Sequence, residues 1–184
     1  MQDPKFNFIE SLSKAEATKF KQRMTMMILA TDMHHHAEHF KEFKNKVETL
    51  GIAPEQDNGN LFIDHTDSAT LSESQQQLLN FCMHTSDLST MSRSFNIGVQ
   101  WVYLLFDEFF DQGDMERSLG LEIQHLCDRE TVNVVSNQPG FITHLVLPQL
   151  TQLSIVLPGA IKWRMNVEAN LLKWQSYQET EQNK

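Results

Sequence analysis

The chain has 184 residues, of which 40% are hydrophobic and 21% are charged, a composition typical of one globular domain with a sizeable core. Its 7 glycines and 5 prolines are too few for a fold with many hairpins, so helices are favoured. A net charge of −9 repels phosphate backbones, so nucleic acid is not an expected partner. Because there is no signal pattern and no apolar run of about 20 residues, we expect a cytoplasmic chain without a transmembrane segment.

The first half of the chain predicts three helices. Ser13 and Glu16 have the spacing of a capping box, in which each side chain accepts a hydrogen bond from the other residue's backbone, and Ser72 with Gln75 repeats the pattern. Between these boxes, apolar residues recur at spacings of three and four. The expected elements are helices over residues 13–31, 32–50 and 72–87, with a turn-rich loop over residues 51–70.

The clearest predicted helix covers residues 95–111. Its apolar residues recur at every third or fourth position. Trp101, Leu105 and Phe110 widen this stripe, so we expect the helix to be buried on most sides. Gly113 is expected to end it in the left-handed conformation.

Proline and apolar spacing guide the prediction of the C-terminal region. Pro139 suits the first turn of a helix capped by Ser136 or Asn137, because a first-turn residue needs no backbone donor. The last helix is expected over residues 159–177, followed by a polar tail over residues 178–184. Its predicted apolar face consists of Ile161, Met165, Ala169 and Leu172.

Three groups of residues are candidates for metal or redox chemistry. The histidines over residues 34–39 include two that are one helical turn apart and could hold zinc, but no further ligand is near in sequence, so a solvated face is favoured. The carboxylates over residues 107–116 lack the spacing of an EF-hand, and an exposed helix end is the simpler interpretation. Cys82 and Cys127 form no CxxC pair and are expected to be buried, reduced thiols.

Two further segments are weak signals when taken singly. Residues 84–89 place one histidine and one aspartate at a helix end. Gln138 and Phe141 put an amide and an aromatic ring on one helix face, which could grip a flat heteroaromatic ring. A capped helix with a phenylalanine in the core explains the same spacing, and spacing alone favours that alternative.

Taken in order, five segments resemble the catalytic domain of the class I cyclic nucleotide phosphodiesterases. The combination of EFF-x-QGD with a later Q-x-GFI is specific to that family. The resemblance extends from about residue 8 to about residue 174 and indicates that residues 1–184 form the C-terminal part of such a domain. The five segments are residues 28–33, 84–89, 108–114, 126–129 and 137–142.

The resemblance implies an all-α, multi-helix bundle that hydrolyses cAMP, cGMP or both to the 5′-monophosphate in cyclic nucleotide signalling. A cyclic purine nucleotide is then the expected partner. In the family, two divalent metals, zinc and magnesium or manganese, share a hydroxide that attacks phosphorus. A histidine protonates the departing 3′ oxygen.

The resemblance also assigns roles to five residues of this chain. Asp87 matches the aspartate that ligates the metals, and Asp32 matches a polar residue near the metal pocket. Gln138 matches the glutamine that hydrogen-bonds the purine edge, where its amide offers a donor and an acceptor side by side. Phe141 matches the aromatic residue that stacks on the base, and Leu105 falls where the family places an apolar residue on the other face.

The largest departure from the family is the absence of its N-terminal motifs. The His-Asn-x-x-His motif and a later His-Asp pair have no counterpart, so the general-acid histidine and most metal ligands are missing from this chain. We therefore expect these residues alone to be inactive. The alternative is a non-catalytic nucleotide-binding or regulatory remnant of a phosphodiesterase.

Smaller departures surround the expected base pocket. Thr90 and Met91 stand where the family usually has Asn-Pro, Asn137 replaces a common serine, and Pro139 replaces an aliphatic residue. They leave the preference for cAMP or cGMP open.

The missing half also has a physical consequence. Helices that would pack on it should expose apolar surface, for example over residues 24–28 or along residues 95–110. Self-association through that surface is expected.

Overall fold

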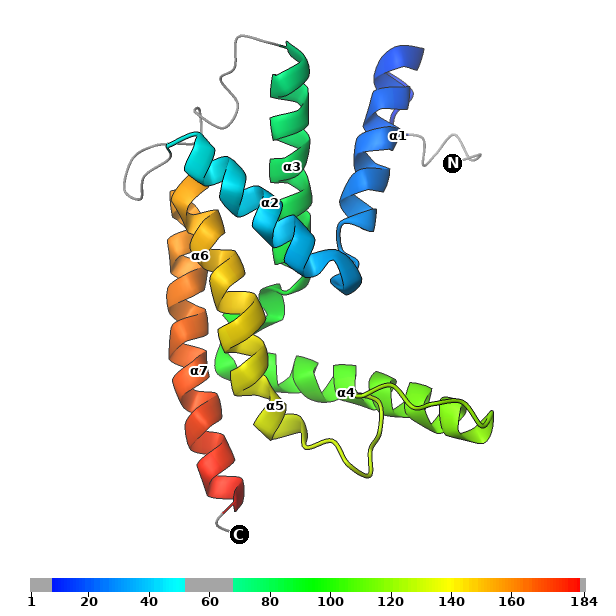
Figure 1. Cartoon of the computed structure of the whole chain (residues 1–184), viewed down its shortest axis with the longest axis vertical. Helices are drawn as coiled ribbons and strands as arrows, with labels where there is room; N and C mark the ends of the chain where they lie inside the picture. Colours follow the sequence, from blue (N-terminus) through cyan, green and yellow to red (C-terminus); the bar gives the residue numbers. More distant parts are fainter. Residues whose placement is uncertain (1–7, 52–67, 183–184) are drawn as a thin grey trace. The chain divides into compact units, whose positions relative to one another are not determined.

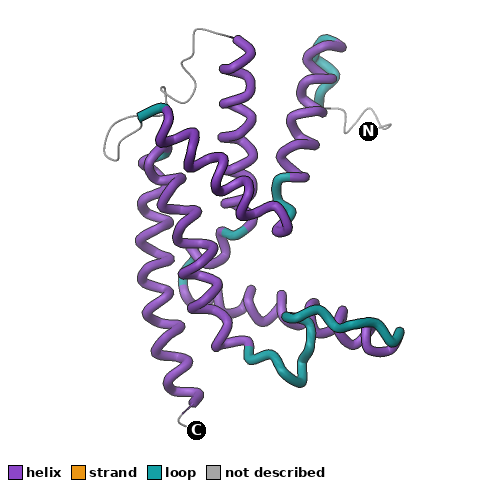
Figure 2. Tube along the Cα trace, in the orientation of Figure 1, coloured by secondary structure: helices purple, strands orange, loops and turns teal. Residues whose placement is uncertain are grey.

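The computed structural model describes residues 8–51 and 68–182, and every regular element among them is helical (Figure 1 and Figure 2). The expected all-α fold is confirmed. Most of the loop expected over residues 51–70 lies outside the described residues. The helices are α1 (Lys14–Leu29), α2 (His36–Thr49), α3 (Ser68–Asp87), α4 (Phe95–Ser118), α5 (Val134–Phe141), α6 (Leu147–Val156) and α7 (Ile161–Gln182).

The helices form two compact units. Unit 1 contains α1, α2 and α3 as far as Ser86, and unit 2 begins at Asp87 and contains α4 to α7. In unit 1, the rings of Phe43 on α2 and Phe81 on α3 stack with their centroids 3.7 Å apart, and both side chains are buried. This aromatic pair joins α2 to α3.

Of the two capping boxes predicted in the first half of the chain, the first is confirmed and the second does not mark a helix start. The Ser13 hydroxyl accepts a hydrogen bond from the backbone N–H of Glu16 at 3.3 Å, and the Glu16 carboxylate accepts from Ser13 at 2.9 Å, which confirms the first capping box. Asp32 caps a short 3-10 turn that leads into α2. The predicted start at Ser72 is wrong, because α3 already runs from Ser68.

The core of unit 2 is apolar and draws on every helix of the unit. Figure 1 shows α6 and α7 lying side by side, and α5 also packs on α7. Removing these side chains from water is the main force that holds the helices together. The buried cluster consists of Met91, Val102, Phe106, Val135, Ile142, Val146, Leu150, Val167 and Trp174.

The apolar face predicted for α7 is wrong. Met165 and Leu172 are 59% and 65% exposed, whereas Val167 and Trp174 are 0% and 1% exposed. Both sets have helical spacing, so periodicity alone did not distinguish them. The buried stripe also contains Asn170, a polar residue, which concealed it in the sequence.

α4 differs from its prediction at its C-terminal end. It continues past Gly113, which was expected to end it, and Gly113 is buried inside the helix. A Cβ atom at this position would overlap the backbone carbonyl of Cys127. The glycine is therefore explained by the close approach of a second chain segment rather than by a helix end.

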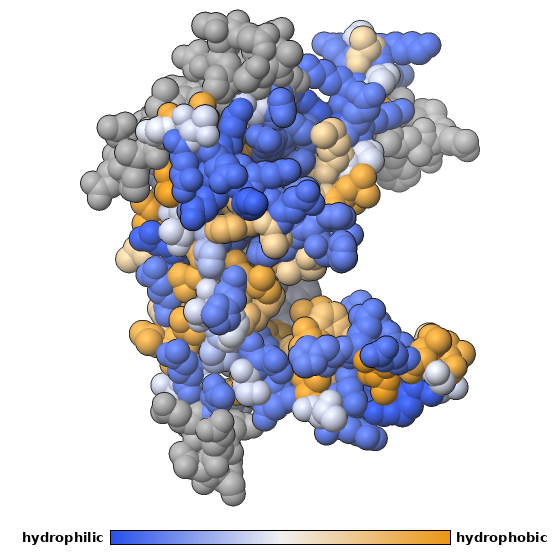
Figure 3. Space-filling view, in the orientation of Figure 1, coloured by the Kyte–Doolittle hydropathy of each residue, from blue (hydrophilic) through white to orange (hydrophobic). Residues whose placement is uncertain are grey.

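The expectation that α4 is buried on most sides is also wrong for the described chain. Val102 and Phe106 are buried, but Trp101 is 54% exposed and Leu105 is 45% exposed. Hydrophobic atoms lie at the surface along α4 in Figure 3. This agrees with the separate expectation that part of the stripe over residues 95–110 is exposed.

α5 begins earlier than its proline suggested. Its cap is Asn133, whose side-chain oxygen accepts a hydrogen bond from the backbone N–H of Ser136 at 2.9 Å. Pro139 therefore lies inside the helix, and the prediction that it occupies the first turn is wrong. Since proline lacks a backbone donor, it removes one hydrogen bond there. A π-helical turn, Ile142–Val146, follows and continues into α6.

Candidate functional site

The two residues expected to hold a purine lie on one helix. Gln138 and Phe141 are three positions apart on α5 and share a face. Gln138 is 3% exposed, and its Nε2 donates to the Val134 carbonyl at 2.8 Å. Because a primary amide has two N–H donors, this bond leaves the second N–H and Oε1 available for other partners. Phe141 is half-buried against the core of unit 2.

The other expected site residues are divided between the two units. Asp87 is the exposed last residue of α3 and the first residue of unit 2. Leu105 is exposed on α4, which contacts α5. Asp32 lies in unit 1, where its carboxylate accepts a hydrogen bond from a backbone N–H two residues later at 2.9 Å. The structure thus brings Asp87, Leu105, Gln138 and Phe141 into one unit, without Asp32.

Asn170 of α7 holds the segment that follows Asp87. Its Nδ2 donates to the carbonyls of Met91 at 2.8 Å and of Arg93 at 2.7 Å, and its side chain is buried. These bonds satisfy backbone carbonyls at the end of a 3-10 turn, where no helix continues to pair them. Sequence reasoning missed this residue. An asparagine at helical spacing from Trp174 was the available signal.

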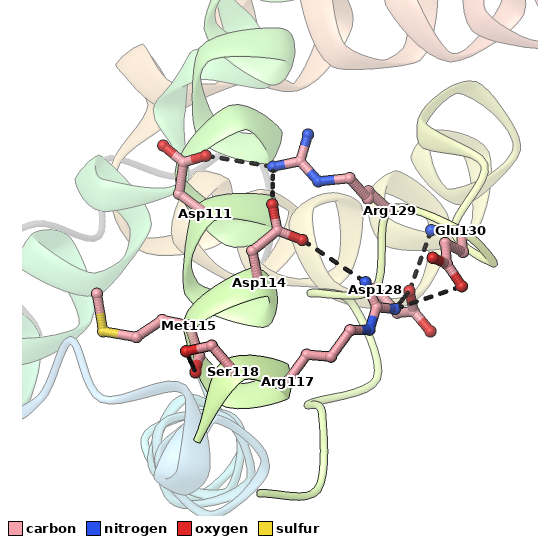
Figure 4. Close-up of polar contacts among 8 residues, drawn as sticks. All are labelled: Asp111, Asp114, Met115, Arg117, Ser118, Asp128, Arg129 and Glu130. Carbon is pink, nitrogen blue, oxygen red and sulfur yellow. Dashed lines mark hydrogen bonds and ion pairs between the residues drawn. The ribbon is translucent and has the colours of Figure 1, made fainter. Parts of the chain in front are cut away.

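Two arginines fasten the segment over residues 119–133 to α4 (Figure 4). Arg117 of α4 reaches outward, with its Nη2 2.7 Å from an oxygen of Asp128 in the segment. Arg129 reaches back, with its Nη2 2.7 Å from an oxygen of Asp114 on α4. In one ion pair the arginine belongs to α4, and in the other it belongs to the segment, so the two parts of the chain are joined by two separate ion pairs.

Arg129 makes two further contacts with α4. It lies 3.2 Å from an oxygen of Asp111, and its guanidinium carbon is 5.4 Å from the centroid of the Phe110 ring. A cation over an aromatic face is attracted by the ring's negative charge density. The sequence alone favours an exposed helix end for the carboxylates over residues 107–116. Two of them, Asp111 and Asp114, also bind Arg129 of a neighbouring segment.

Two carboxylates, that of Glu116 on α4 and that of Asp128 in the segment, accept hydrogen bonds from backbone N–H groups of the segment. The backbone N–H of Gln124 donates to Glu116 at 2.9 Å and lowers the pKa of that carboxyl. The N–H of Glu130, assisted by Arg117, lowers the pKa of Asp128. Since the segment leads directly to the cap of α5, these contacts fix the approach to Gln138.

A buried histidine pair in unit 1 was not predicted from the sequence. His36 Nδ1 and His84 Nε2 are 2.7 Å apart, and the residues are 8% and 1% exposed. A single proton between two neutral rings gives a hydrogen bond, whereas two charged rings would repel. Burial, followed by the proximity of His84 and His39, lowers the pKa of His36.

Their positions explain why the pair was missed. His36 and His84 are far apart in sequence, and His36 stands in a run whose members His34 and His35 are exposed, as the solvated-face interpretation expected. No spacing rule separated the inward ring from its neighbours.

The described residues do not by themselves form the metal centre that the resemblance implies. Among them, no group of three or more histidine, cysteine, aspartate or glutamate side chains is arranged to hold a metal ion. Asp87 supplies one carboxylate, and zinc sites take three or four protein ligands. Cys82 and Cys127 are free thiols, partly and fully buried respectively, and burial raises the pKa of both.

Known proteins similar to this chain are cyclic nucleotide phosphodiesterases. The sequence model of the 3'5'-cyclic nucleotide phosphodiesterase family matches residues 1–167. The probable 3',5'-cyclic-AMP phosphodiesterase pde-4 of Caenorhabditis elegans is 31% identical over 177 residues, which cover 96% of this chain and 25% of that protein. The dual specificity calcium/calmodulin-dependent 3',5'-cyclic nucleotide phosphodiesterase 1C of Mus musculus is 30% identical over 153 residues, which cover 83% of this chain and 19% of that protein.

A solved structure supports the same fold. The structure of LmjPDEB1 in complex with IBMX matches with a TM-score of 0.78 at 24% identity, covering 97% of this chain and 49% of that chain. This chain therefore has the all-α architecture of a phosphodiesterase catalytic domain. It belongs to the 3',5'-cyclic nucleotide phosphodiesterase family.

The match covers only part of the relatives. This chain spans about a quarter or less of the curated relatives' length and about half of the solved chain. Across residues 8–51 and 68–182, we find no helix with the length and hydrophobicity needed to cross a membrane.

Proposed function

We propose that this chain supplies the base-binding half of a metal-dependent 3',5'-cyclic nucleotide phosphodiesterase. The complete domain hydrolyses cAMP, cGMP or both to the 5′-monophosphate in the cytoplasm, as part of cyclic nucleotide signalling. The observation that carries the proposal is the family match over residues 1–167. The placement of Gln138 and Phe141 on one helix, in the unit that contains Asp87, supports it.

Each residue of the site has a separate task in this proposal. Gln138 hydrogen-bonds the edge of the purine, while Phe141 and Leu105 cover its two faces. Asp87 contributes one anionic ligand, and Asp32 lines the metal pocket. Zinc and magnesium or manganese, when bound, supply positive charge that stabilises the phosphoryl oxygens. The remaining ligands and the general acid come from a second polypeptide segment.

The isolated chain tests the first part of the proposal. Purified protein with added zinc and magnesium or manganese is expected to hydrolyse neither cAMP nor cGMP, because one carboxylate does not hold two metal ions. Metal-dependent release of 5′-monophosphate by this chain alone would refute the expectation.

The assembled domain tests the second part. This chain is mixed with the N-terminal catalytic-domain half of the Caenorhabditis elegans relative, and cyclic nucleotide hydrolysis is expected. Asp87→Ala should abolish turnover, and Phe141→Ala should raise KM more than it lowers kcat. Asp107→Ala, which removes an exposed carboxylate of α4, is the matched control and should leave turnover unchanged. Equal effects of the two aspartate variants would contradict the role of Asp87.

A non-catalytic, nucleotide-binding remnant is the second candidate. It is favoured by the lack of a three-ligand metal cluster among the described residues. Equilibrium dialysis, together with the hydrolysis assay on the assembled mixture, distinguishes the two candidates. A remnant would bind cyclic nucleotide in a Gln138-dependent way, and the assembled mixture would show no hydrolysis.

A further inference from the structure

α7 has an apolar face that is exposed, opposite the face that packs in unit 2. Ile161, Met165 and Leu172 are 38%, 59% and 65% exposed. At about 100° per residue, these three side chains lie within about 40° of one another, on the side of the helix away from Val167 and Trp174. Hydrophobic atoms lie at the surface over α7 in Figure 3. The helix therefore has two apolar faces, and only one of them is covered within the described chain.

We call the exposed face, made of Ile161, Met165, Ala169 and Leu172, the outer stripe of α7. Its residues follow the seven-residue repeat of a two-stranded coiled coil, because Met165 and Leu172 are one heptad apart and Ala169 lies between them on the adjoining row. Ala169 is exposed, and a small side chain at this place lets two helices approach closely. Joining two such stripes would remove exposed apolar groups from water, which is favourable.

Opposite charges flank the outer stripe. Glu168 borders it on one side, and Lys173, five residues later, borders it on the other. In a parallel pair of helices, each flanking residue faces the flanking residue five positions later on the partner helix. Glu168 of each copy would therefore face Lys173 of the other copy, and a symmetric pair would contain this ion pair twice.

Both charged groups have capacity for these contacts. One oxygen of Glu168 lies 3.5 Å from Nε of Arg164, and the half-exposed carboxylate has a second oxygen to accept from another partner. Nζ of Lys173 lies 5.6 Å from the centroid of the Phe95 ring, a contact that at an exposed site is worth only about 0.5–1 kcal/mol. Neither contact is strong enough to prevent pairing across an interface.

The same charges disfavour an antiparallel pair. The antiparallel register that matches Met165 with Leu172 would bring the two copies of Glu168 together on one flank, where like charges repel. An anionic lipid surface would attract Lys173 but repel Glu168, whereas a second copy of the stripe satisfies both. The flanking charges thus select both the occupant and its orientation.

We propose that the outer stripe of α7 is the interface through which two copies of this chain associate as a parallel, two-fold symmetric dimer. Met165, Ala169 and Leu172 meet the same residues of the partner copy, as an interface between identical surfaces requires. The stripe covers only about three turns of helix, so the interface is small and the association is weak and reversible. The proposal is independent of the proposed activity.

Sedimentation equilibrium of the full chain measures this association, and a monomer–dimer equilibrium is expected at micromolar concentrations. Leu172→Glu should weaken the association at least tenfold, because it places a carboxylate in the apolar centre of the interface. Leu104→Glu is the matched control, since Leu104 of α4 is 61% exposed, and should alter the dissociation constant less than twofold. Glutamate is a good helix former, so both variants should retain full helicity by circular dichroism.

Exchange of the flanking charges tests the parallel orientation. Glu168→Lys should weaken the association, because it places two cations together across the interface, and Lys173→Glu should do so by placing two anions together. The double variant Glu168→Lys/Lys173→Glu reverses each ion pair and should restore the association. Both variants of Glu168 lose the contact with Arg164 within α7, so restoration would depend on the partner copy alone.

Every other outcome overturns the proposal. A chain that stays monomeric at every concentration, or equal weakening by the two leucine variants, would exclude the outer stripe as the interface. Weakening by Leu104→Glu alone would place self-association on the surface over residues 95–110. A double variant that stays weak would exclude the parallel pairing. A monomeric chain that binds vesicles of phosphatidylcholine and phosphatidylserine, and loses this binding in Leu172→Glu, would make a membrane the occupant.

Discussion

Asn170 shows how a single buried amide can hold the turn that follows an expected functional residue. Asn170→Ala removes both hydrogen bonds to the carbonyls that follow Asp87, and the free energy of unfolding should fall by about 1–3 kcal/mol. Urea unfolding followed by tryptophan emission measures this change. All 3 tryptophans of the chain lie in unit 2, which also contains Asn170.

Asn166 provides the matched control for this prediction. It is exposed and donates one longer hydrogen bond, 3.2 Å, to the Ser92 carbonyl. Asn166→Ala should change the free energy of unfolding by no more than about 0.5 kcal/mol. Equal losses in the two alanine variants would show that burial of the amide is not what holds the turn.

Gly113 tests the close approach of two backbone segments. In an unobstructed helix, Gly→Ala stabilises by about 1 kcal/mol. At Gly113 the added methyl group would meet the Cys127 carbonyl, so Gly113→Ala should instead destabilise unit 2 by about 1–3 kcal/mol.

Gly140, inside α5, provides the matched control, because a methyl group added there would meet no atom of another segment within 4 Å. Gly140→Ala should therefore have the opposite sign, and the midpoints of urea unfolding for the two alanine variants should move in opposite directions. A stabilising effect at both glycines would rule out a steric role for Gly113.

At the scale of elements, the segment over residues 119–133 depends on α4 for its position. Arg129→Gln removes the ion pairs with Asp111 and Asp114 and the contact with Phe110. Amide hydrogen exchange in the segment should become faster, while exchange in α7 stays unchanged, because the ion pairs are local to α4.

Arg164→Gln is the control for this experiment, since it removes an ion pair with Glu168 that lies entirely within α7. It should leave exchange in the segment over residues 119–133 unaltered. Faster exchange throughout the chain in either variant would indicate a general loss of stability rather than release of one segment.

The elements that could be predicted are those determined by local chemistry. The capping box at Ser13 and the stripe through Val102 and Phe106 depend on residues within one or two turns, and both are confirmed. The order of the family motifs likewise indicated the family. Self-association through exposed apolar surface stays a prediction.

The elements that could not be predicted are determined by partners distant in sequence. The buried face of α7 includes Asn170 because backbone carbonyls distant in sequence accept its hydrogen bonds. Position 113 requires glycine because the backbone carbonyl of Cys127 lies where a Cβ atom would be. The pairing of His36 with His84 joins residues that no spacing rule connects. In each case the local pattern allowed two interpretations, and a tertiary contact selected one.

At the scale of the whole chain, the two units are expected to respond to acid at different pH values. Unit 1 contains His36, whose pKa is lowered from an ordinary value near 6.5, mainly by burial and then by His84 and His39. Unit 2 contains Glu116 and Asp128, whose pKa values are lowered from ordinary values near 4.5 and 3.8. A lowered pKa means that the unfolded chain binds the proton more readily than the folded chain.

The contribution of His36 to the free energy of unfolding is therefore complete above about pH 6.5 and is lost as the pH falls through the lowered pKa. The contribution of the two carboxylates to the free energy of unfolding is retained until below about pH 4.5. Lowering the pH from 7 to 5 should decrease the stability of unit 1, followed by its amide NMR signals, before the tryptophan emission of unit 2 changes. His36→Gln should flatten this dependence, because glutamine does not titrate in that range, while His34→Gln, at an exposed position, should preserve it. Loss of both units at the same pH, or a slope unchanged by His36→Gln, would contradict the assignment of the acid response to the buried histidine pair.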